Sequence, residues 1–256
     1  MTMKLFELNG RVAIVTGGNG GIGLGIARGL AQAGASIAVA GRNSEKNAAA
    51  VKALEALGAK AAALEVDVRD EASCRGMVAA AAKRFGRVDI LVNNAGTNIR
   101  KLPQDATLAD WREVLDTNLT SAFLCSQAAY PEMVKAGGGK IISIGSMLSI
   151  FGGPLMAAYG SSKGGIVQLT KSLAAAWGKD NIQANAILPG FINTDLTKTA
   201  KVQIPGLEQR VVSRTFAARW GEPEDFAGIA VFLASAASDY VTGTAIPVDG
   251  GYSVQM

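Results

Sequence analysis

The sequence contains no histidine among its 256 residues. Imidazole is the side chain that most often transfers protons near neutral pH, so acid–base chemistry in this protein must use other groups. Cysteine is almost as scarce, since only Cys74 and Cys125 are present, both within stretches of helical periodicity. Two such cysteines signal neither a disulfide framework nor a metal cluster. We therefore expect both in the core and predict no metal site.

Long apolar runs and dense clusters of charge are also missing. No apolar run approaches 18 residues, and residues 1–10 carry Lys4 and Glu7 where a signal peptide would be apolar. These absences predict a cytoplasmic protein without a membrane span. The net charge is +4, but the 25 basic residues are scattered along the chain. Scattered charge predicts a solvated surface and no nucleic-acid partner.

The chain alternates short apolar runs with longer segments of helical periodicity. The runs are rich in β-branched residues and predict buried strands at 12–15, 36–40, 61–66, 90–92, 140–144, 182–188 and 245–248. Helices are predicted between them, at 21–33, 45–57, 71–85, 108–134, 157–177 and 223–233. This order predicts one α/β domain over residues 1–256, a doubly wound parallel β-sheet (Rossmann fold) of about seven strands with helices on both faces.

One segment, residues 193–219, is less regular than the rest and contains Pro205 followed by Gly206. It follows the end of a predicted strand, where sheets of this kind bind their ligands. We interpret it as an insertion near the site that acts as a substrate lid.

A glycine-rich turn follows the first predicted strand and leads directly into a helix, with the sequence TGGNGGIG at residues 16–23. Glycine permits close approach of a pyrophosphate, whose charge is met by free amide groups at the helix start. The context therefore predicts a dinucleotide-binding turn. Gly18, Gly20 and Gly23 match one glycine pattern, and Gly17, Gly21 and Gly23 match another, so spacing alone does not rank them.

The end of the second predicted strand bears on the choice of cofactor. An NAD-binding version of the fold would carry an acid here, but the chain has Arg42 after Gly41. A guanidinium can hold a 2′-phosphate, which predicts a preference for NADP(H); NAD(H) stays usable if Arg42 only projects into water. Asp67 and Val68, after the third strand, are predicted to line the adenine.

Asn94, Ala95 and Gly96 follow the fourth predicted strand and are small enough to admit a ribose. Further on, Tyr159 and Lys163 lie four residues apart on one predicted helix face. A nearby ammonium favours the phenolate, so this pair can do proton chemistry without imidazole. A free tyrosine has a pKa near 10, and we expect Lys163 and an oxidised nicotinamide to lower it.

Taken in order and spacing, these motifs resemble the classical short-chain dehydrogenase/reductase family over residues 10–252. The resemblance rests on TGGNGGIG at 16–23, Asp67, NNAG at 93–96, Asn118 in DTNLT, Ser146, Tyr159-x-x-x-Lys163, and Pro189-Gly190 with Thr194 in PGFINT. It implies a catalytic tetrad of Asn118, Ser146, Tyr159 and Lys163. It also implies a cofactor held by Gly17, Asn19, Gly21, Ile22, Gly23, Arg42, Asp67, Val68, Asn94, Ala95, Gly96, Tyr159, Lys163, Pro189, Gly190, Ile192 and Thr194.

The resemblance implies a role for each member of this tetrad. Tyr159 exchanges the proton, Ser146 orients the carbonyl oxygen, Lys163 holds the nicotinamide ribose, and Asn118 positions a water that relays protons. The implied activity is NADP(H)-dependent hydride transfer between a carbonyl and a secondary alcohol. A cofactor-binding regulatory protein without turnover is the alternative class. Members of the family commonly pair long helices into dimers and assemble as tetramers, so we expect a homotetramer in which residues 108–134 and 157–177 are paired and 241–252 lies near a second interface.

The substrate is left open by the sequence. Residues 97–100, 147–153 and 191–216 are expected to face it, and Arg100 or Lys101 could grip a carboxylate unless both are exposed to solvent. The chain resembles NAD(H)-dependent sugar and sugar-acid dehydrogenases of the glucose and gluconate type, and 3-oxoacyl carrier-protein reductases comparably well. Five apolar residues would instead favour a hydrophobic ketone: Leu148, Ile150, Phe151, Leu155 and Met156.

Overall fold

The computed structural model describes residues 4–254, apart from the side chain of Leu196, so the ends of the predicted domain 1–256 lie outside the described residues. Seven parallel strands form one sheet in the order β3-β2-β1-β4-β5-β6-β7. They are β1 (Val12–Thr16), β2 (Ser36–Gly41), β3 (Ala61–Glu65), β4 (Ile90–Asn93), β5 (Gly139–Ile144), β6 (Ile182–Pro189) and β7 (Ala245–Val248). The predicted strands are confirmed to within one residue at each end.

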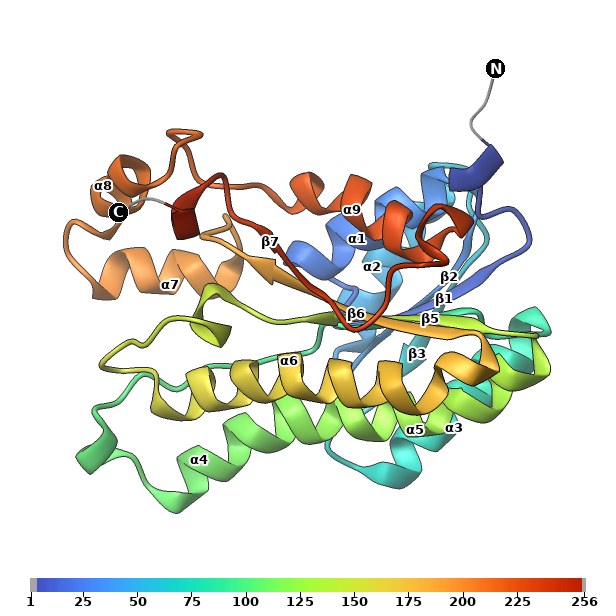
Figure 1. Ribbon diagram of the computed structural model, residues 1–256, viewed down its shortest axis with the longest axis horizontal. Coiled ribbons are helices and arrows are strands. Elements are labelled where there is room, and N and C mark those ends of the chain that lie inside the picture. The colour runs from blue at the N-terminus through green and yellow to red at the C-terminus, as the bar shows by residue number, and fades with distance from the viewer. Residues whose placement is uncertain (1–3, 255–256) are drawn as a thin grey trace.

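Helices cover both faces of the sheet, as predicted (Figure 1). One layer holds α1 (Gly21–Gln32), α2 (Ser44–Glu55) and α9 (Ala227–Ala234). The other holds α3 (Glu71–Phe85), α4 (Leu108–Leu115), α5 (Ser121–Lys135) and α6 (Ala157–Trp177). None of the described helices is long and apolar enough to cross a membrane.

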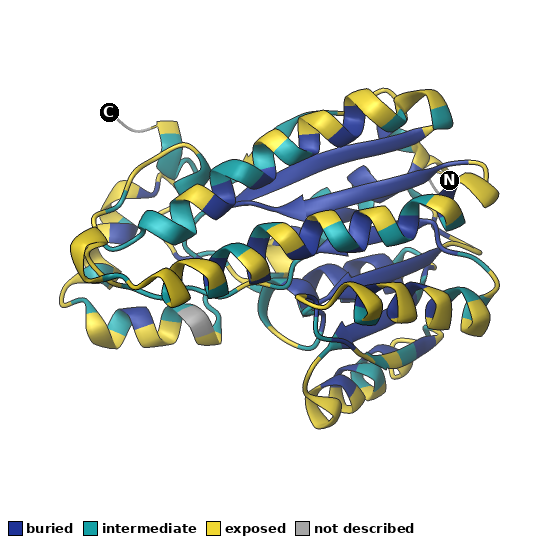
Figure 2. Ribbon diagram, turned by 90° about the horizontal axis from the view of Figure 1, so that it is seen from below, coloured by how far each residue is buried: buried dark blue, intermediate teal, exposed yellow. Residues whose placement is uncertain are grey.

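The strands are apolar on both faces because each face packs under helices. Along β1, Ala13 and Val15 join the core below α1 and α9, whereas Ile14 between them joins the core below α3 and α5. Successive side chains of a strand point to opposite faces, so a strand covered on both sides needs no polar alternation. Figure 2 shows the result, a buried sheet between helices whose outer sides are exposed.

Two predicted segments differ in detail from the structure. The long helix predicted at 108–134 is interrupted by a π-helical turn at Asp116–Thr120, where one extra residue enters the helix between α4 and α5. The segment 193–219, predicted to be irregular, contains two short helices, α7 (Asp195–Gln203) and α8 (Leu207–Arg214). Both lie beyond the carboxyl end of β6 (Figure 1), and their role as a lid stays a prediction.

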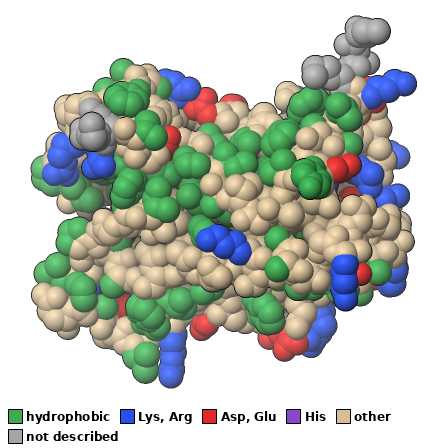
Figure 3. All heavy atoms as spheres, viewed as in Figure 1, with side chains coloured by type: hydrophobic (Ala, Val, Ile, Leu, Met, Phe, Trp, Pro, Cys, Tyr) green, Lys and Arg blue, Asp and Glu red, His purple; other side chains and the backbone are tan. Residues whose placement is uncertain are grey.

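Charge on the surface is spread rather than gathered. On the face shown in Figure 3, Lys and Arg side chains stand apart from one another with acidic side chains between some of them. Hydrophobic side chains gather toward the end of the molecule that α7 and α8 form.

The contact between α1 and the segment before α9 depends on Gly25. A Cβ at this position would overlap the carbonyl group of Pro223. Gly25→Ala should therefore lower the free energy of unfolding by about 1–3 kcal/mol, since neither backbone can move freely. Gly76, in the exposed middle of α3, has nothing within 4 Å of the same position. Gly76→Ala should raise stability by about 0.5–1 kcal/mol, so urea unfolding of both variants must show shifts of opposite sign.

Candidate active site

The structure ranks the glycines of the first turn. Gly17 and Gly21 have φ of 63° and 50°, the left-handed region that side chains disfavour. A Cβ on Gly23 would overlap the Gly17 carbonyl and the Asn94 amide. Gly20, by contrast, is extended and faces open space. The pattern Gly17, Gly21, Gly23 is the one that the backbone requires, while Gly20 is not constrained.

The ends of β1 and β4 are tied together around this turn. The Asn94 side chain donates hydrogen bonds to the carbonyls of Thr16 (2.9 Å) and Gly17 (3.1 Å). In return, the backbone amides of Asn94 and Ala95 donate to the Thr16 hydroxyl, at 3.0 and 3.1 Å. Asn94 therefore ties the glycine turn to the end of β4, which gives a structural reason for an asparagine at this strand end.

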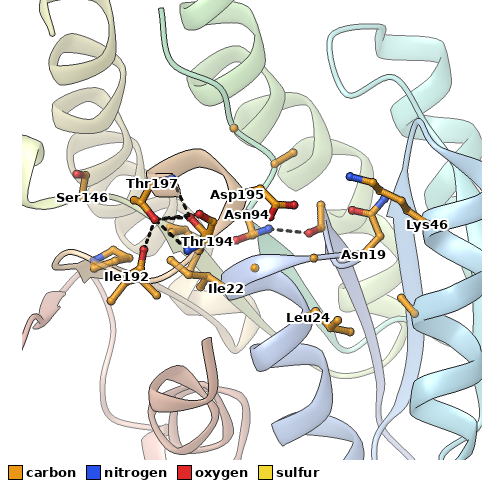
Figure 4. Close-up of a pocket in the computed structure, with 18 of the residues that line it drawn as sticks. Asn19, Ile22, Leu24, Lys46, Asn94, Ser146, Ile192, Thr194, Asp195 and Thr197 are labelled. Atoms are coloured by element: carbon orange, nitrogen blue, oxygen red, sulfur yellow. Dashed lines mark hydrogen bonds between the residues drawn. The ribbon is translucent and has the colours of Figure 1, made fainter. Parts of the chain in front are cut away.

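A cavity of about 680 Å³ opens along this turn. Figure 4 shows it reaching from Ser146 and Ile192 on one side to Asn19 and Lys46 on the other, with Ile22 and Leu24 of α1 between them. Most of the predicted cofactor-binding residues line it: Gly17, Asn19, Gly21, Ile22, Asn94, Ala95, Gly96, Tyr159, Lys163, Pro189, Gly190, Ile192 and Thr194. Gly23 lies under the turn and does not line it. Thr194 also caps α7 by accepting a hydrogen bond from the Thr197 amide. One residue therefore lines the cavity and begins α7.

A second hollow of about 290 Å³ continues beyond Asn19 and Gly17. Arg42, Asp67 and Val68 line it, as predicted for the adenosine end of a cofactor. The Asp67 carboxylate pairs with Arg69 at 2.7 Å, and this hydrogen-bonded cation lowers the carboxyl pKa to about 2. Asp67 therefore carries a negative charge throughout the physiological range of pH.

Sequence reasoning missed two residues at this end. Lys46, in the first turn of α2, lines both hollows and adds a second cation to that of Arg42. The sequence signal that could have identified Lys46 is its position four residues after Arg42, in the first turn of the predicted helix. Asn47 is buried, accepts from the Asn19 side chain at 2.6 Å and donates to the Gly41 carbonyl at 2.8 Å. It thus fixes the turn against the end of β2.

Ser146, Tyr159 and Lys163 line one end of the larger cavity. Ser146 follows β5, and the other two lie one turn apart in α6. The linking residue is Ser149, which sequence reasoning also missed. Its hydroxyl accepts from the Ser146 amide at 3.1 Å and donates to the Lys163 carbonyl at 2.7 Å. Ser149 therefore ties the segment after β5 to helix α6.

The Lys163 ammonium is almost fully buried and donates to the Ile144 carbonyl at 2.6 Å, the end of β5. It lies 5.7 Å from the centre of the Tyr159 ring. Burial lowers the pKa of Lys163 from 10.5 to about 8. The group is therefore mostly charged at neutral pH but readily neutralised above it.

The phenol departs from the sequence-based expectation. Burial raises the pKa of Tyr159 above its ordinary value of 10, and the neighbouring Ser146 hydroxyl and the positive charge of Arg100 only partly oppose this. In the protein without cofactor, burial outweighs the lowering that was expected from Lys163 together with an oxidised nicotinamide. Burial therefore keeps Tyr159 as a protonated phenol in the protein alone.

Asn118 lies in the π-helical turn and is buried behind Gly96. Its side chain accepts from the Thr97 amide at 2.8 Å and donates to the Thr97 carbonyl and the Ser162 hydroxyl, both at 3.0 Å. Asn118 thus joins the segment after β4 to α6. It does not line the cavity, and its predicted role in a proton relay stays a prediction.

Lys101 is not among the residues that line the cavities described above. Its ammonium is exposed and pairs with Asp110 of α4 at 2.7 Å, which agrees with the alternative that this charge lies at the surface. The same Asp110 carboxylate also caps α4 by accepting a hydrogen bond from the Thr107 amide.

Comparisons with known proteins agree over almost the whole chain. The model of a family described as enoyl-(acyl carrier protein) reductase matches residues 17–253. A 2-dehydro-3-deoxy-D-gluconate 5-dehydrogenase of Escherichia coli (strain K12) is 42% identical over 256 residues, covering 98% of this chain and 99% of that protein. A gluconate 5-dehydrogenase of Gluconobacter oxydans (strain 621H) is 39% identical over 252 residues, 98% of either chain. The crystal structure of a gluconate 5-dehydrogenase from Burkholderia cenocepacia J2315, in complex with NADP and tartrate, is 39% identical, with a TM-score of 0.95 over 100% of both chains.

Proposed function

The chain belongs to the short-chain dehydrogenase/reductase family of oxidoreductases, and we propose that it transfers a hydride between NADP(H) and a sugar acid, at a carbonyl or secondary alcohol. The observation that carries this proposal is one shared cavity. Tyr159, Ser146 and Lys163 line the same space as Gly17 and Gly21 of the dinucleotide turn. A cofactor and a proton donor are thereby brought to one place.

The residues fit a nicotinamide dinucleotide. The left-handed Gly17 and Gly21 open the turn at the start of α1, where free amides can meet a pyrophosphate. When bound, the cofactor supplies or accepts the hydride. Tyr159 supplies the proton to the oxygen of the substrate during reduction and takes it back during oxidation. Ser146 donates a hydrogen bond to that oxygen, where negative charge develops.

The cofactor preference is proposed from the charges at the adenosine end. Arg42 and Lys46 both line that end. A planar guanidinium and an ammonium together can hold a 2′-phosphate, whereas no acid follows β2 to bind ribose hydroxyls. The NADP named with the Burkholderia structure agrees with this preference.

Arg42→Ala should raise the Michaelis constant for NADP(H) about 10- to 100-fold, because charge-assisted hydrogen bonds to the 2′-phosphate are lost. The constant for NAD(H) should hardly change, since that cofactor lacks the phosphate. Arg75→Ala, at an exposed position of α3, is the matched control and should leave both constants alone. The proposal fails if the NADP(H) constant of Arg42→Ala is unchanged, or if the native enzyme prefers NAD(H).

A sugar acid is proposed as substrate because relatives of nearly equal length act on gluconates by name. The tartrate named with the Burkholderia structure is likewise a small hydroxy acid. A panel of aldonates, sugars, polyols, ketones and acyl thioesters, each assayed with both nicotinamide cofactors, tests substrate and cofactor together. Faster turnover of acyl thioesters than of any aldonate would replace this substrate class with that of the carrier-protein reductases.

We also propose a homotetramer. Large apolar side chains are exposed on α4 and α5, with Leu108 62%, Trp111 40% and Phe123 44% exposed. Tyr240, next to the second predicted interface at 241–252, is fully exposed. Such side chains are suited to burial between subunits. Sedimentation of a monomer at micromolar concentration would contradict this assembly. The cytoplasmic location stays a prediction.

A further inference from the structure

The two cations proposed to hold the 2′-phosphate are not themselves fixed by burial. Arg42 and Lys46 are exposed, and of residues 42–49 only Asn47 is buried, with 1% of its surface exposed. Long, exposed cationic side chains keep many rotamers, so the points where they leave the backbone decide where their charges can meet. The geometry of this end of the cofactor site therefore depends on how Asn47 is held.

Both N–H groups of the Asn47 amide are used. They donate to the Gly41 carbonyl at 2.8 Å and to the Leu64 carbonyl at 3.2 Å, while the amide oxygen accepts from the Asn19 side chain at 2.6 Å. Turning the amide by 180° would place its oxygen against two carbonyls, so these partners also fix its orientation. One side chain thus joins α2 to the ends of β2 and β3 and to the glycine turn.

Helix α2 does not itself call for an asparagine at this position. Asparagine is unfavourable inside a helix, because its side chain competes with the backbone for hydrogen bonds. Asn47 is the fourth residue of α2, and the cap of that helix is already supplied by Asn43, which accepts from the Lys46 amide. The Asn47 side chain bonds instead to three other segments. Its buried amide therefore serves the surroundings of α2 rather than the helix.

The residues that Asn47 holds are walls of the hollow at the adenosine end. Asn47 does not line that hollow, but four residues bonded or adjacent to it do: Asn19, Gly41, Arg42 and Lys46. Gly41 directly precedes Arg42, and Lys46 directly precedes Asn47. The bond from Asn47 to the Gly41 carbonyl therefore sets the spacing of the two points from which the cations extend. Figure 4 shows Asn19 and Lys46 at this same end of the larger cavity.

The packing of this network leaves little room for movement. A Cβ on Gly41 would lie 2.8 Å from Nδ2 of Asn19 and 3.0 Å from Oδ1 of Asn47. Both amides thus rest directly on the last residue of β2. Loss of the Asn47 amide would free the start of α2 from this strand end.

We propose that Asn47 is a positioning residue for the 2′-phosphate of NADP(H), since it sets the spacing of Arg42 and Lys46 and holds both against the glycine turn. The inference rests on the proposed cofactor preference and names the buried residue that places the two cations. Charge-assisted hydrogen bonds from two cations to one phosphate need their donors at a fixed separation, so a small shift of either attachment point lowers affinity. An adenosine without the 2′-phosphate makes no such demand.

Two fragments of the cofactors test this role without turnover, since 2′,5′-ADP carries the 2′-phosphate and 5′-AMP lacks it. Asn47→Leu keeps a side chain of similar size but cannot form the three hydrogen bonds. In titration calorimetry it should weaken 2′,5′-ADP binding about 10-fold and 5′-AMP binding by no more than about 3-fold. In rate assays the KM for NADPH should rise, while kcat at saturating NADPH stays native. Asn47→Ala removes the same bonds without leucine's bulk and should change the fragment ratio in the same direction, so either variant that folds decides the test.

Asn185→Leu is the control for a merely structural effect. Asn185 is also 1% exposed, donates to the Val241 carbonyl at 2.8 Å and accepts from the Thr244 amide at 3.2 Å, but it lines neither hollow of the cofactor site. Both leucine variants should lower the midpoint of urea unfolding. Only Asn47→Leu should change the ratio of the two fragment affinities.

The outcomes separate this inference from the proposed function. Native protein that prefers 2′,5′-ADP, with the same preference in the Asn47 variants, would refute the positioning role and leave the proposed cofactor in place. Native protein that binds both fragments equally would overturn the NADP(H) preference and the positioning role with it. If no substrate is turned over but Asn47→Leu lowers the preference for 2′,5′-ADP, the positioning role stands and the proposed reaction falls.

Discussion

Replacing Tyr159 with phenylalanine is expected to lower turnover by about 10³-fold or more in both directions while leaving cofactor binding nearly unchanged. The ring stays in place beside Ser146, but the group that exchanges the proton is gone. The chain has no histidine, and among the described residues that line this cavity Tyr159 is the only phenol and Asp195, at the start of α7, the only carboxyl. Initial rates with the best substrate, and NADPH binding measured by fluorescence, give the two readings.

Tyr240→Phe is the matched control, because it removes the same hydroxyl from a ring outside the cavity and keeps the apolar ring itself. It should behave as the native protein. A Tyr159→Phe variant that keeps a tenth of native turnover would show that another group transfers the proton. Native protein that binds NADPH but turns over nothing in the panel would favour the regulatory class, in which the same cavity binds cofactor without reaction.

The raised pKa of Tyr159 predicts how the rates of oxidation and reduction depend on pH. Because burial favours the phenol, the protein is prepared to donate a proton at neutral pH, which suits reduction. Oxidation needs the phenolate, whose fraction grows with pH below the pKa. We therefore expect the oxidation rate to rise from pH 7 to pH 10, while the reduction rate does not rise over that range.

Replacing Lys163 with methionine should lower turnover by about 10²-fold or more and, in the absence of cofactor, change how stability depends on pH. The ammonium is buried, with its pKa lowered from 10.5 to about 8. Between these values the unfolded chain holds a proton that the folded protein has released. The free energy of unfolding of the native protein should therefore rise with pH, and the variant lacks this contribution.

The difference in free energy of unfolding between native protein and Lys163→Met should move by about 2–3 kcal/mol in favour of the native protein between pH 7 and pH 10. Urea unfolding at both pH values measures it, and taking the difference cancels the other groups that titrate. Lys171→Met, an exposed position of the same helix α6, is the control and should show no such change. A constant difference across the range would mean that Lys163 is not desolvated.

Local patterns predicted the framework well because their physical cause is local. β1 and β6 are buried along their whole length, and the continuous apolar runs that predicted them are what a strand between two helical layers requires. Helix α3 was predicted to the residue, since Asp70 caps its start and Gly86 ends it in a left-handed conformation. The π-helical turn at 116–120 was missed, because an inserted residue leaves the apolar periodicity almost unchanged.

The positions of several predicted site residues could be foreseen where one residue type at one spacing was sufficient. The strand-end positions of Asn94 and Asp67, and the i, i+4 pair in α6, follow from order along the chain. The sequence does not determine which of several possible partners a side chain contacts. Lys101 and Arg100 are adjacent and carry the same charge, yet one pairs with Asp110 and the other lines a cavity.

The sequence by itself determined the alternation of strand and helix, the glycine-rich turn and the placing of Tyr159 and Lys163 on one helix face, because hydrophobic period, glycine position and helical spacing are properties of short segments. Only the tertiary structure decided which glycines the turn requires, which group the Lys163 ammonium binds, and that burial raises the pKa of Tyr159. Those outcomes depend on burial and on competition for partners among segments that are distant in the chain: Lys101 pairs with Asp110 of α4, and the Lys163 ammonium donates to the carbonyl at the end of β5.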